Sequence, residues 1–527
     1  MKCKGTYSNY VEWILTRLCF IIVLVLTDSL SSQAQISQNI QLMAHVQGPS
    51  GMLYNDIWGY VDSLGNEFAV IGGRTAIFIY NVNDCANPQN ILTYYDGSNT
   101  VWRDFKTYRH YIYATGDGIG FNKGLQIINM NTSPPTVTNF TTHFQKAHNI
   151  FIDEPNGRLY VVGSNTVNRG LIIYDLNSNP ANPTMIKSVR LDTLINSSLN
   201  TYVHDVYVED NIAYCSTNNS GYSVWDVSDV NNIQLIDFNT GNSGYNHSSW
   251  KHPYEEYYYV AYEVPFGIPI RIFKRIGNDF QYITEFNNPL EAPQYTNCVP
   301  HNPFVKGDTL YISYYHDGLQ VYDVGDPENP RRIGWYDTYP NNNGNGYSGY
   351  NGCWGTYPFL PSGCILASDI SYGLFTFKVI QRAHFVENGH LSFATPEAGF
   401  ILSNENNQWY LVNADLSGNL TASLVENPEY NVEFSDSDLF VKGAYQLFLR
   451  NASNQIFKFD ISTSGAINNT PASVPATGVV NNQTGNIKIS KRRRGIVMED
   501  SNGQAWRIGV DGTGQIYTTK VDTPQKF

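Results

Sequence analysis

Charged residues are scarce in this sequence, and positive charge is scarcer than negative charge. Asp, Glu, Lys and Arg together make up 15% of the 527 residues, and the formal net charge is −13. A nucleic-acid partner requires a basic footprint on the protein. The composition therefore argues against nucleic acid as a partner, and solubility is sufficient to explain the acidic balance.

Several motifs that carry catalytic or metal chemistry are also missing. The sequence contains no Cys-x-x-Cys pair, no Gly-x-Ser-x-Gly turn, no P-loop, no His-Glu-x-x-His pattern and no Asp-rich calcium loop. Each of these patterns places particular side chains around a zinc ion, a nucleophile, a phosphate or a calcium ion. Their absence argues against a cysteine-based metal site and against the corresponding enzyme classes.

One long apolar run is present, and it lies close to the N-terminus. Residues 18–26 are apolar, Arg17 precedes them, and Ser32-Gln33-Ala34 offers the small residues that signal peptidase recognises. We predict a signal peptide over residues 1–34, with an uncleaved signal anchor as the alternative. No later segment reaches the roughly 18 apolar residues that span a bilayer. The mature chain is therefore predicted to have no transmembrane segment and to be secreted or held at the cell surface.

Cysteine is rare, with seven residues in the whole chain. Cys3 and Cys19 lie within the predicted signal peptide, so an odd number remains after cleavage. Export permits disulfides, and Cys353 with Cys364 could bridge two neighbouring strands. At least one thiol is expected to stay unpaired in a monomer.

Aromatic residues and glycine are abundant, as is typical of an all-β protein. Aromatic residues make up 14% of the chain. One short sequence motif recurs, which we call the phrase: an apolar strand that ends in an aromatic or apolar residue, followed mostly by Asp, Asn or Lys and then mostly by an apolar residue. Seven copies follow one another at intervals of 46 to 55 residues, which is typical of propeller blades with four strands each. The copies occupy residues 77–82, 125–130, 171–176, 222–227, 270–274, 319–324 and 374–379.

The seventh copy lacks the outer strand that follows the other copies. A matching strand occurs instead at residues 40–46, at the start of the predicted mature chain. In a closed ring, an N-terminal strand can complete the last blade and remove its open edge. The sequence therefore predicts a seven-bladed β-propeller over residues 36–380, closed by its N-terminal strand.

A short motif precedes each copy of the phrase. The motifs are Tyr54-Asn55-Asp56-Ile57-Trp58, Trp102-Arg103-Asp104, Ala147-His148-Asn149, Val203-His204-Asp205, Asn246-His247-Ser248-Ser249-Trp250, His301-Asn302 and the run from Trp354 to Gly363. Together they resemble the motifs of the choice-of-anchor B family of exported bacterial propellers with LVIVD-type repeats. The resemblance implies a constant propeller and a variable C-terminal attachment device, with no defined biochemical role.

The same motifs define the candidate site, because each falls 20 to 30 residues before its phrase and is expected to face the central channel. Three interpretations remain open: polar groups that join neighbouring blades by hydrogen bonds, a transition-metal site, or a pocket for a small ligand or a peptide end. The predicted ligands of such a metal are His148, His204, His247 and His301. The predicted ligand-binding residues are Asp56, Trp58, Trp102, Asp104, His148, Asn149, His204, Asp205, His247, Trp250, His301, Asn302 and Trp354. Glu263 could pair with a ring histidine, but an exposed carboxylate at a strand end is the preferred interpretation.

The pattern changes after residue 385, where three shorter units are expected over residues 385–527. Each has a Gln-x-aromatic motif (Gln408, Gln455, Gln504) and a turn glycine ten residues after the glutamine. This threefold spacing is similar to that of ricin-type β-trefoils, which would imply carbohydrate binding. A generic β-repeat module that attaches the protein is the alternative.

Two functions follow from these patterns. The favoured one is an extracellular binding module whose partner is a protein, a peptide or a carbohydrate. The alternative is a metal-dependent extracellular hydrolase that uses the axial His and Asp residues, since a bound metal can generate a nucleophilic water near neutral pH.

Overall fold

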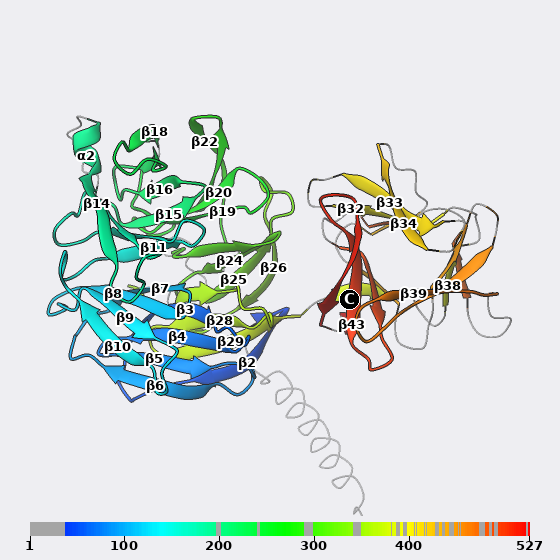
Figure 1. Ribbon diagram of the computed structural model, residues 1–527, viewed down its shortest axis with the longest axis horizontal. Helices are drawn as coiled ribbons and strands as arrows, with labels where there is room; N and C mark the ends of the chain where they lie inside the picture. The colour runs from blue at the N-terminus through cyan, green and yellow to red at the C-terminus, as the bar shows by residue number, and fades with distance from the viewer. Residues whose placement is uncertain are drawn as a thin grey trace, which may run out of the picture.

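The computed structural model is built almost entirely of β-strands (Figure 1). The described residues are 37–195, 202–239, 243–288, 299–340, 349–380, 382–385, 390–393, 398–404, 406, 408–415, 417, 419–426, 432–434, 438–441, 447–451, 453, 455–473, 480–483, 487–489, 494–522 and 525–526. The predicted signal peptide, residues 1–34, lies outside them. Within them, no helix has the length and the apolar character that a membrane crossing requires.

The described residues up to 380 form seven antiparallel sheets, and the chain follows most of them from an inner strand to an outer one. The sheets are β3 (Tyr54–Val61), β4 (Glu67–Gly73), β5 (Ala76–Asn81), β6 (Gln89–Tyr95); β7 (Trp102–Tyr108), β8 (Tyr111–Asp117), β9 (Leu125–Asn129), β10 (Thr136–Phe140); β11 (Asn149–Asp153), β12 (Arg158–Val162), β13 (Gly170–Asp175), β14 (Thr184–Arg190); β15 (Asp205–Glu209), β16 (Ile212–Ser216), β17 (Tyr222–Asp226), β18 (Gln234–Asn239); β19 (Asn246–Lys251), β20 (Tyr257–Tyr262), β21 (Ile270–Ile276), β22 (Asp279–Phe286); β23 (Pro303–Lys306), β24 (Thr309–Ser313), β25 (Leu319–Asp323), β26 (Arg331–Tyr336); and β27 (Cys353–Tyr357), β28 (Ile365–Asp369), β29 (Gly373–Val379) with β2 (Ile40–Val46). A two-residue strand, β1 (Ser37–Gln38), extends the sixth sheet, and a short helix, α2 (Leu191–Leu194), follows β14.

The seven sheets follow one another around a ring. The first strands of the first six sheets are successive neighbours, and β27 of the last sheet lies against β24 of the sixth sheet and β3 of the first. The repeated phrase forms the third strand of each sheet, where side chains on both faces are buried because the sheets pack face to face. The prediction of an all-β propeller is therefore confirmed.

A strand from the N-terminal side of the described chain belongs to the last sheet. Strand β2 pairs antiparallel with β29, with Ile40 opposite Val379, so the last sheet combines strands from both ends of this part of the chain (Figure 1). The edge of β29 is thereby covered, and Ile40 is buried.

The predicted disulfide between Cys353 and Cys364 is wrong. Cys364 is bonded to Cys85, and Cys353 is a buried free thiol. Cys85 follows β5 of the first sheet and Cys364 precedes β28 of the last, so the bond crosses the junction where the ring closes. Cys215 is also buried and free, and Cys298 lies outside the described residues.

The C-terminal part contains three further sheets, which start with β30 (Arg382–Phe385) and are drawn in yellow to red in Figure 1. Each sheet contains one of the three expected units as an antiparallel three-stranded meander. The meanders are β32 (Phe400–Ser403), β33 (Trp409–Ala414), β34 (Leu420–Val425); β37 (Leu447–Arg450), β38 (Ile456–Ile461), β39 (Ile467–Pro471); and β42 (Ile496–Glu499), β43 (Ala505–Val510), β44 (Ile516–Val521).

The three units are interlocked by parallel strand pairs. A single strand that precedes each unit pairs with the meander of the next unit in cyclic order: β31 (His390–Phe393) with β37, β36 (Asp438–Val441) with β42, and β41 (Ile487–Ile489) with β32. Three outer strands, β30, β35 (Val432–Phe434) and β40 (Val480–Gln483), pair parallel with β36, β41 and β31, and β45 (Gln525–Lys526) pairs with β30.

The Gln-x-aromatic motifs close the first turn of each meander. Asn404, Asn451 and Asp500 each accept a backbone hydrogen bond from the glutamine four residues later. The aromatic rings pack between units, because Trp506 lies against Gly465 and Tyr410 lies against Gly514.

Candidate functional site

Four histidines meet at the axis of the propeller. His148, His204, His247 and His301 lie at or just before the first strands of four successive sheets. Their ring centroids are 4.1, 4.3 and 4.3 Å apart in that order. We call these four residues the histidine arc. Trp354, from the next sheet, extends it at 4.8 Å from His301.

Hydrogen bonds define which ring nitrogen carries the proton in two histidines of the arc. Nδ1 of His204 lies 2.9 Å from the backbone carbonyl of His247, and Nδ1 of His301 bonds the carbonyl of Trp354 in the same way. A carbonyl oxygen only accepts, so Nδ1 carries the proton in both rings.

Burial holds these rings in the neutral form. It lowers the pKa of His301 to about 3, and it lowers the pKa of His204 and of His247 well below the usual value. A neutral ring that is protonated at Nδ1 has an unprotonated Nε2. His204 and His301 therefore each offer one lone pair, at Nε2.

The arc forms one wall of a cavity of about 510 Å³. Eleven of the thirteen predicted ligand-binding residues line it, and the two that do not are Trp58 and Trp250. Aromatic side chains that the sequence analysis did not assign to the site complete the wall. They are Tyr54, Tyr202, Tyr245, Tyr315 and Tyr350.

The position of Glu263 differs from our expectation of an exposed carboxylate. It is not an exposed carboxylate at a strand end, since its side chain is only 13% exposed and lines the cavity. Its Oε1 accepts a hydrogen bond of 2.7 Å from the hydroxyl of Tyr315, and its Oε2 lies 3.9 Å from Nε2 of His247. Burial raises the pKa of Glu263 to about 7, against the opposing effect of the Tyr315 hydrogen bond.

His148, at the other end of the arc, faces a different carboxylate. Its Nδ1 lies 3.4 Å from Asp117, and Lys146 lies 3.5 Å from the second oxygen of the same carboxylate. Burial alone would raise the pKa of Asp117, but contacts with His148, the backbone N–H of Gly118 and the charge of Lys146 together lower it below its usual value.

A belt of polar side chains lies next to the arc and joins neighbouring sheets. Asp56 accepts a hydrogen bond of 2.9 Å from the backbone N–H of Phe105 in the next sheet, and Asp104 accepts one of 2.9 Å from Ile150. The Asn149 amide donates to Asp205 at 3.0 Å. The expectation that polar groups connect the blades therefore describes Asp56, Asp104, Asn149 and Asp205, and it also describes His204 and His301, whose Nδ1 atoms bond carbonyls of the next sheet.

Lys106 supplies the positive charge in this belt. Its ammonium lies 2.9 Å and 3.0 Å from the two oxygens of Asp104, and it also lies over the ring of Trp58. Burial and the nearby Asp104 raise the pKa of Asp205 to about 7. The same two causes raise the pKa of Asp56 well above its usual value.

Trp58 and Trp250 belong to an aromatic layer beyond the belt. Trp250 packs against Tyr207, Phe304 and Phe359, with ring centroids 4.9, 4.8 and 5.5 Å away. Trp58 packs against Tyr357 at 4.9 Å. These two tryptophans face the channel as expected, but they lie in a layer that is separate from the wall of the cavity.

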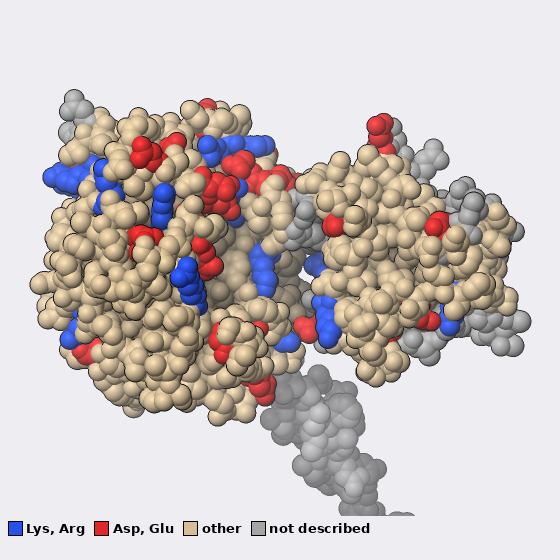
Figure 2. All heavy atoms as spheres, in the orientation of Figure 1, with Lys and Arg blue, Asp and Glu red and all other residues tan. Residues whose placement is uncertain are grey.

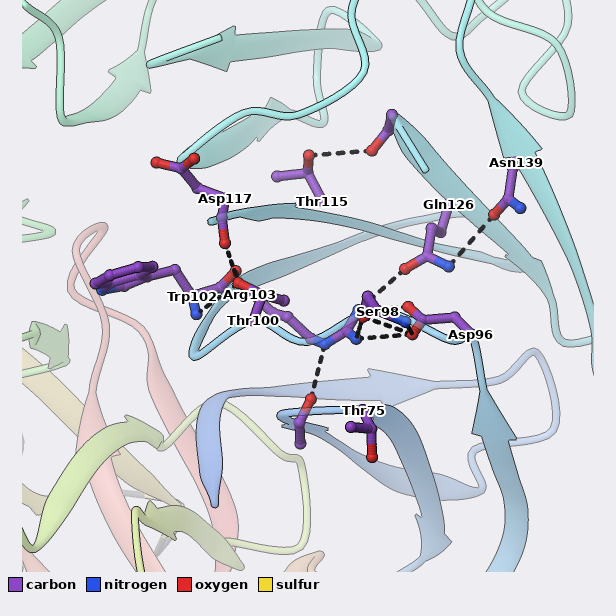
Figure 3. A network of polar contacts seen from close by, with 12 residues as sticks. Thr75, Asp96, Ser98, Thr100, Trp102, Arg103, Thr115, Asp117, Gln126 and Asn139 are labelled. Atoms are coloured by element: carbon purple, nitrogen blue, oxygen red, sulfur yellow. Dashed lines mark hydrogen bonds and ion pairs between the residues drawn. The ribbon is translucent and has the colours of Figure 1, made fainter. Parts of the chain in front are cut away.

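Arg103, between Trp102 and Asp104, holds two sheets together. Its guanidinium forms a fully buried ion pair of 2.9 Å with Asp96 and also donates to Gln126 and to the carbonyl of Gly73. Figure 3 shows this guanidinium contacting the side chains of Asp96, Ser98 and Gln126. The network fixes the strand that presents Trp102 to the cavity.

Comparison with known proteins finds solved structures of low similarity to this chain. It resembles the β-propeller domain of Cps50 (Swd1) from Myceliophteria thermophila with 9% identity and a TM-score of 0.43, over 61% of this chain and 96% of that chain. It also resembles the computationally designed Ika8 protein with 7% identity and a TM-score of 0.40, over 62% of this chain and 83% of that chain. No family model matches the sequence, and no curated protein does.

Three of the cavity residues that the sequence analysis missed or misjudged share a position in their sheets. Asp117 ends β8, Glu263 follows β20, and Tyr315 lies two residues after β24. The second strand of each sheet runs antiparallel to the first, so its end lies beside the start of the first strand, where the histidines are. The ends of the second strands are thus the signal that could have identified these residues.

Proposed function

We propose that this chain is an exported binding protein and that its axial cavity holds the ligand. The cavity itself carries the proposal. Its volume of about 510 Å³ lies within the roughly 300–1,000 Å³ of small-molecule sites, and its wall combines aromatic faces with a few convergent polar groups. The ligand class that fits is a small polar molecule, or the end of a peptide or glycan, with one face that can stack on an aromatic ring.

Exposed aromatic side chains at the cavity support this proposal. The side chain of Trp102 is 43% exposed and that of Tyr350 is 40% exposed, although both are large and apolar. Large aromatic groups that stay in contact with water at a concave site are available to a ligand.

Export and attachment are parts of the same proposal. The predicted signal peptide and the Cys85–Cys364 disulfide support export, because disulfides persist in oxidising compartments. The resemblance to the choice-of-anchor B family supports attachment through the C-terminal sheets. Charged side chains are scattered over a mostly uncharged surface on the face shown in Figure 2.

Binding can be tested with the chain that starts at residue 35, applied to glycan and peptide arrays. We expect retention of at least one probe class, and we expect Trp102→Ala to weaken it about tenfold, the effect of losing one aromatic contact. Tyr95→Ala is the matched control, because Tyr95 is 60% exposed but lies on the outer strand β6. Equal effects of the two substitutions, or no retention at all, would refute the proposal.

A second candidate function is a metal-dependent hydrolase that works in the same cavity. The observation that favours it is the position of Glu263 beside His247, because a carboxylate whose pKa is raised to about 7 suits a general base near neutral pH. Its test is zinc-dependent hydrolysis of p-nitrophenyl esters and phosphates. Turnover that is abolished by a chelator and by Glu263→Gln would support it, and no turnover above that of the buffer would exclude it for these substrates.

A further inference from the structure

Three side chains of the cavity converge in a way that the sequence did not predict. His247, Glu263 and His301 each offer one ligand atom, and the three atoms lie within 4.8 Å of one another. Among the described residues this is the one group of three or more His, Cys, Asp or Glu side chains with such geometry. His148 and His204, the other two predicted metal ligands, do not belong to it.

We propose that His247, His301 and Glu263 bind a divalent transition-metal ion at the wall of the axial cavity. The inference rests on the proposed function only in that it concerns the same cavity, and it gives that cavity a specific chemistry. Two imidazoles and one carboxylate are a donor set that suits Zn²⁺, with three protein ligands and one position left open.

The hydrogen bonds around the group orient its ligand atoms. Nδ1 of His301 donates its proton to the carbonyl of Trp354, so Nε2 is the nitrogen of His301 that is available to a metal. The hydroxyl of Tyr315 occupies Oε1 of Glu263, which leaves Oε2, the oxygen nearest to Nε2 of His247. Metal-binding histidines and carboxylates in proteins are commonly oriented by outer partners of this kind.

The charge balance of the cavity also favours a cation here. Glu263 is largely buried, and among the described residues its one ion-pair partner is His247. The 3.9 Å between its Oε2 and Nε2 of that imidazole is too long for a hydrogen bond, so His247 does not bind the carboxylate directly. A buried carboxylate is costly unless it is protonated, paired or bound to a metal.

Metal binding requires only a small contraction of the group. Ligand atoms about 2.1 Å from a tetrahedral ion are about 3.4 Å from one another, so ligand atoms that now lie within 4.8 Å of one another would approach by up to about 1.4 Å. The open position would face the cavity, where it could accept an oxygen of a carboxylate or a phosphate. If a metal binds here, we therefore expect the molecule that the cavity binds to carry an anionic group.

The test is titration of the metal-free chain, residues 35–527, with ZnCl₂ by calorimetry and with CoCl₂ by absorption spectroscopy. We expect one ion per chain and the visible bands of tetrahedral Co²⁺. Glu263→Gln, which preserves shape, and His247→Gln should each weaken zinc binding at least tenfold. Tyr315→Phe tests the positioning role of Tyr315 and should weaken it severalfold while keeping the cobalt bands.

His143→Gln is the matched control, because His143 is a half-buried histidine that contacts Tyr174 outside the cavity. It should bind zinc as the unchanged chain does, and circular dichroism should confirm that all variants fold. No binding by the unchanged chain, or equal binding by Glu263→Gln and the unchanged chain, would overturn the inference.

Failure of this inference can be told apart from failure of the proposed function. A chain that binds no metal but retains array probes in a Trp102-dependent manner would refute the metal site and leave the binding function standing. A chain that binds zinc through Glu263 but retains no probe would refute the binding function as tested and leave the metal site standing.

Discussion

At the scale of single residues, some buried charges are compensated by a partner of opposite charge from a neighbouring sheet. The clearest example is Arg103, whose side chain and that of Asp96 are both fully buried. Removing one member of such a pair leaves the other charge without compensation in a medium of low polarity, which costs about 3–5 kcal/mol. The pair therefore stabilises the contact between the first two sheets only as long as both charges are present.

We predict that Asp96→Asn lowers the free energy of unfolding of the propeller by about 3–5 kcal/mol at pH 7. Glu285→Gln is the control, because the Glu285 side chain is 39% exposed in its ion pair of 3.3 Å with Arg271, and ion pairs at the surface contribute about 0–1 kcal/mol. Urea unfolding followed by fluorescence measures both. Equal losses for the two variants would show that Arg103 is not a critical buried charge.

The same pair predicts a pH dependence. Burial raises the pKa of Asp96, but the charge and hydrogen bonds of Arg103 outweigh it, so the folded pKa lies below the usual 3.8. A lowered carboxyl pKa contributes stability that is present above the unfolded pKa and is lost as the pH falls through the folded pKa. The difference in the free energy of unfolding between the unchanged chain and Asp96→Asn should therefore have its full value at pH 7 and become smaller below about pH 4. A difference that stays constant down to pH 3 would contradict this.

The sequence was sufficient to predict which histidines meet, because all four occupy one position of a repeated unit. It did not predict the depth of each side chain in the channel. Trp58 lies two residues beyond Asp56 on an innermost strand, and two residues advance a strand by about 6.6 Å. Trp58 therefore faces the channel one layer deeper, in the aromatic layer. Glu263 was misjudged because a residue after a strand looks exposed in sequence, whereas here that strand ends at the axis.

At the scale of elements, the repeated phrase corresponds to a local feature of the strands. A register shift between the third and fourth strands occurs just before its aromatic residue in six sheets, at Tyr80, Tyr174, Trp225, Phe273, Tyr322 and Phe377. Such bulges bend a strand and increase its twist. The spacing of the phrase predicted the sheets, but the bulges were not predicted, because they depend on the pairing of a strand that the phrase does not contain.

We predict that the strand β2 is required for the ring. A chain that starts at residue 47 lacks this strand and leaves the edge of β29 unpaired, and unpaired edges promote association between chains. It should aggregate or elute as oligomers in size-exclusion chromatography, whereas the chain that starts at residue 35 should elute as a discrete species. An identical elution volume and melting temperature for the two chains would show that ring closure does not need β2.

At the scale of the whole molecule, the Cys85–Cys364 disulfide is a second closure of the ring, beside β2. The two cysteines are 279 residues apart in sequence and lie on the first and last sheets. The sequence suggested Cys353 as the partner of Cys364 because the two are close along the chain. In the closed ring, Cys85 rather than Cys353 lies within bonding distance of Cys364. The two cysteines come together only when the first and last sheets meet. Buried disulfides commonly contribute about 2–5 kcal/mol, and most in long loops.

We predict that the double variant Cys85→Ser, Cys364→Ser melts several degrees below the unchanged chain, because the unfolded state regains the freedom that the bond removes. Reductant should lower the melting temperature of the unchanged chain toward that of the variant, and it should leave the variant unaffected. Mass spectrometry after alkylation under denaturing, non-reducing conditions should find Cys215 and Cys353 labelled and Cys364 protected. If Cys353 and Cys364 were both protected from alkylation, these two would be bonded to each other, as the sequence suggested. The ring would then be closed by strand pairing alone.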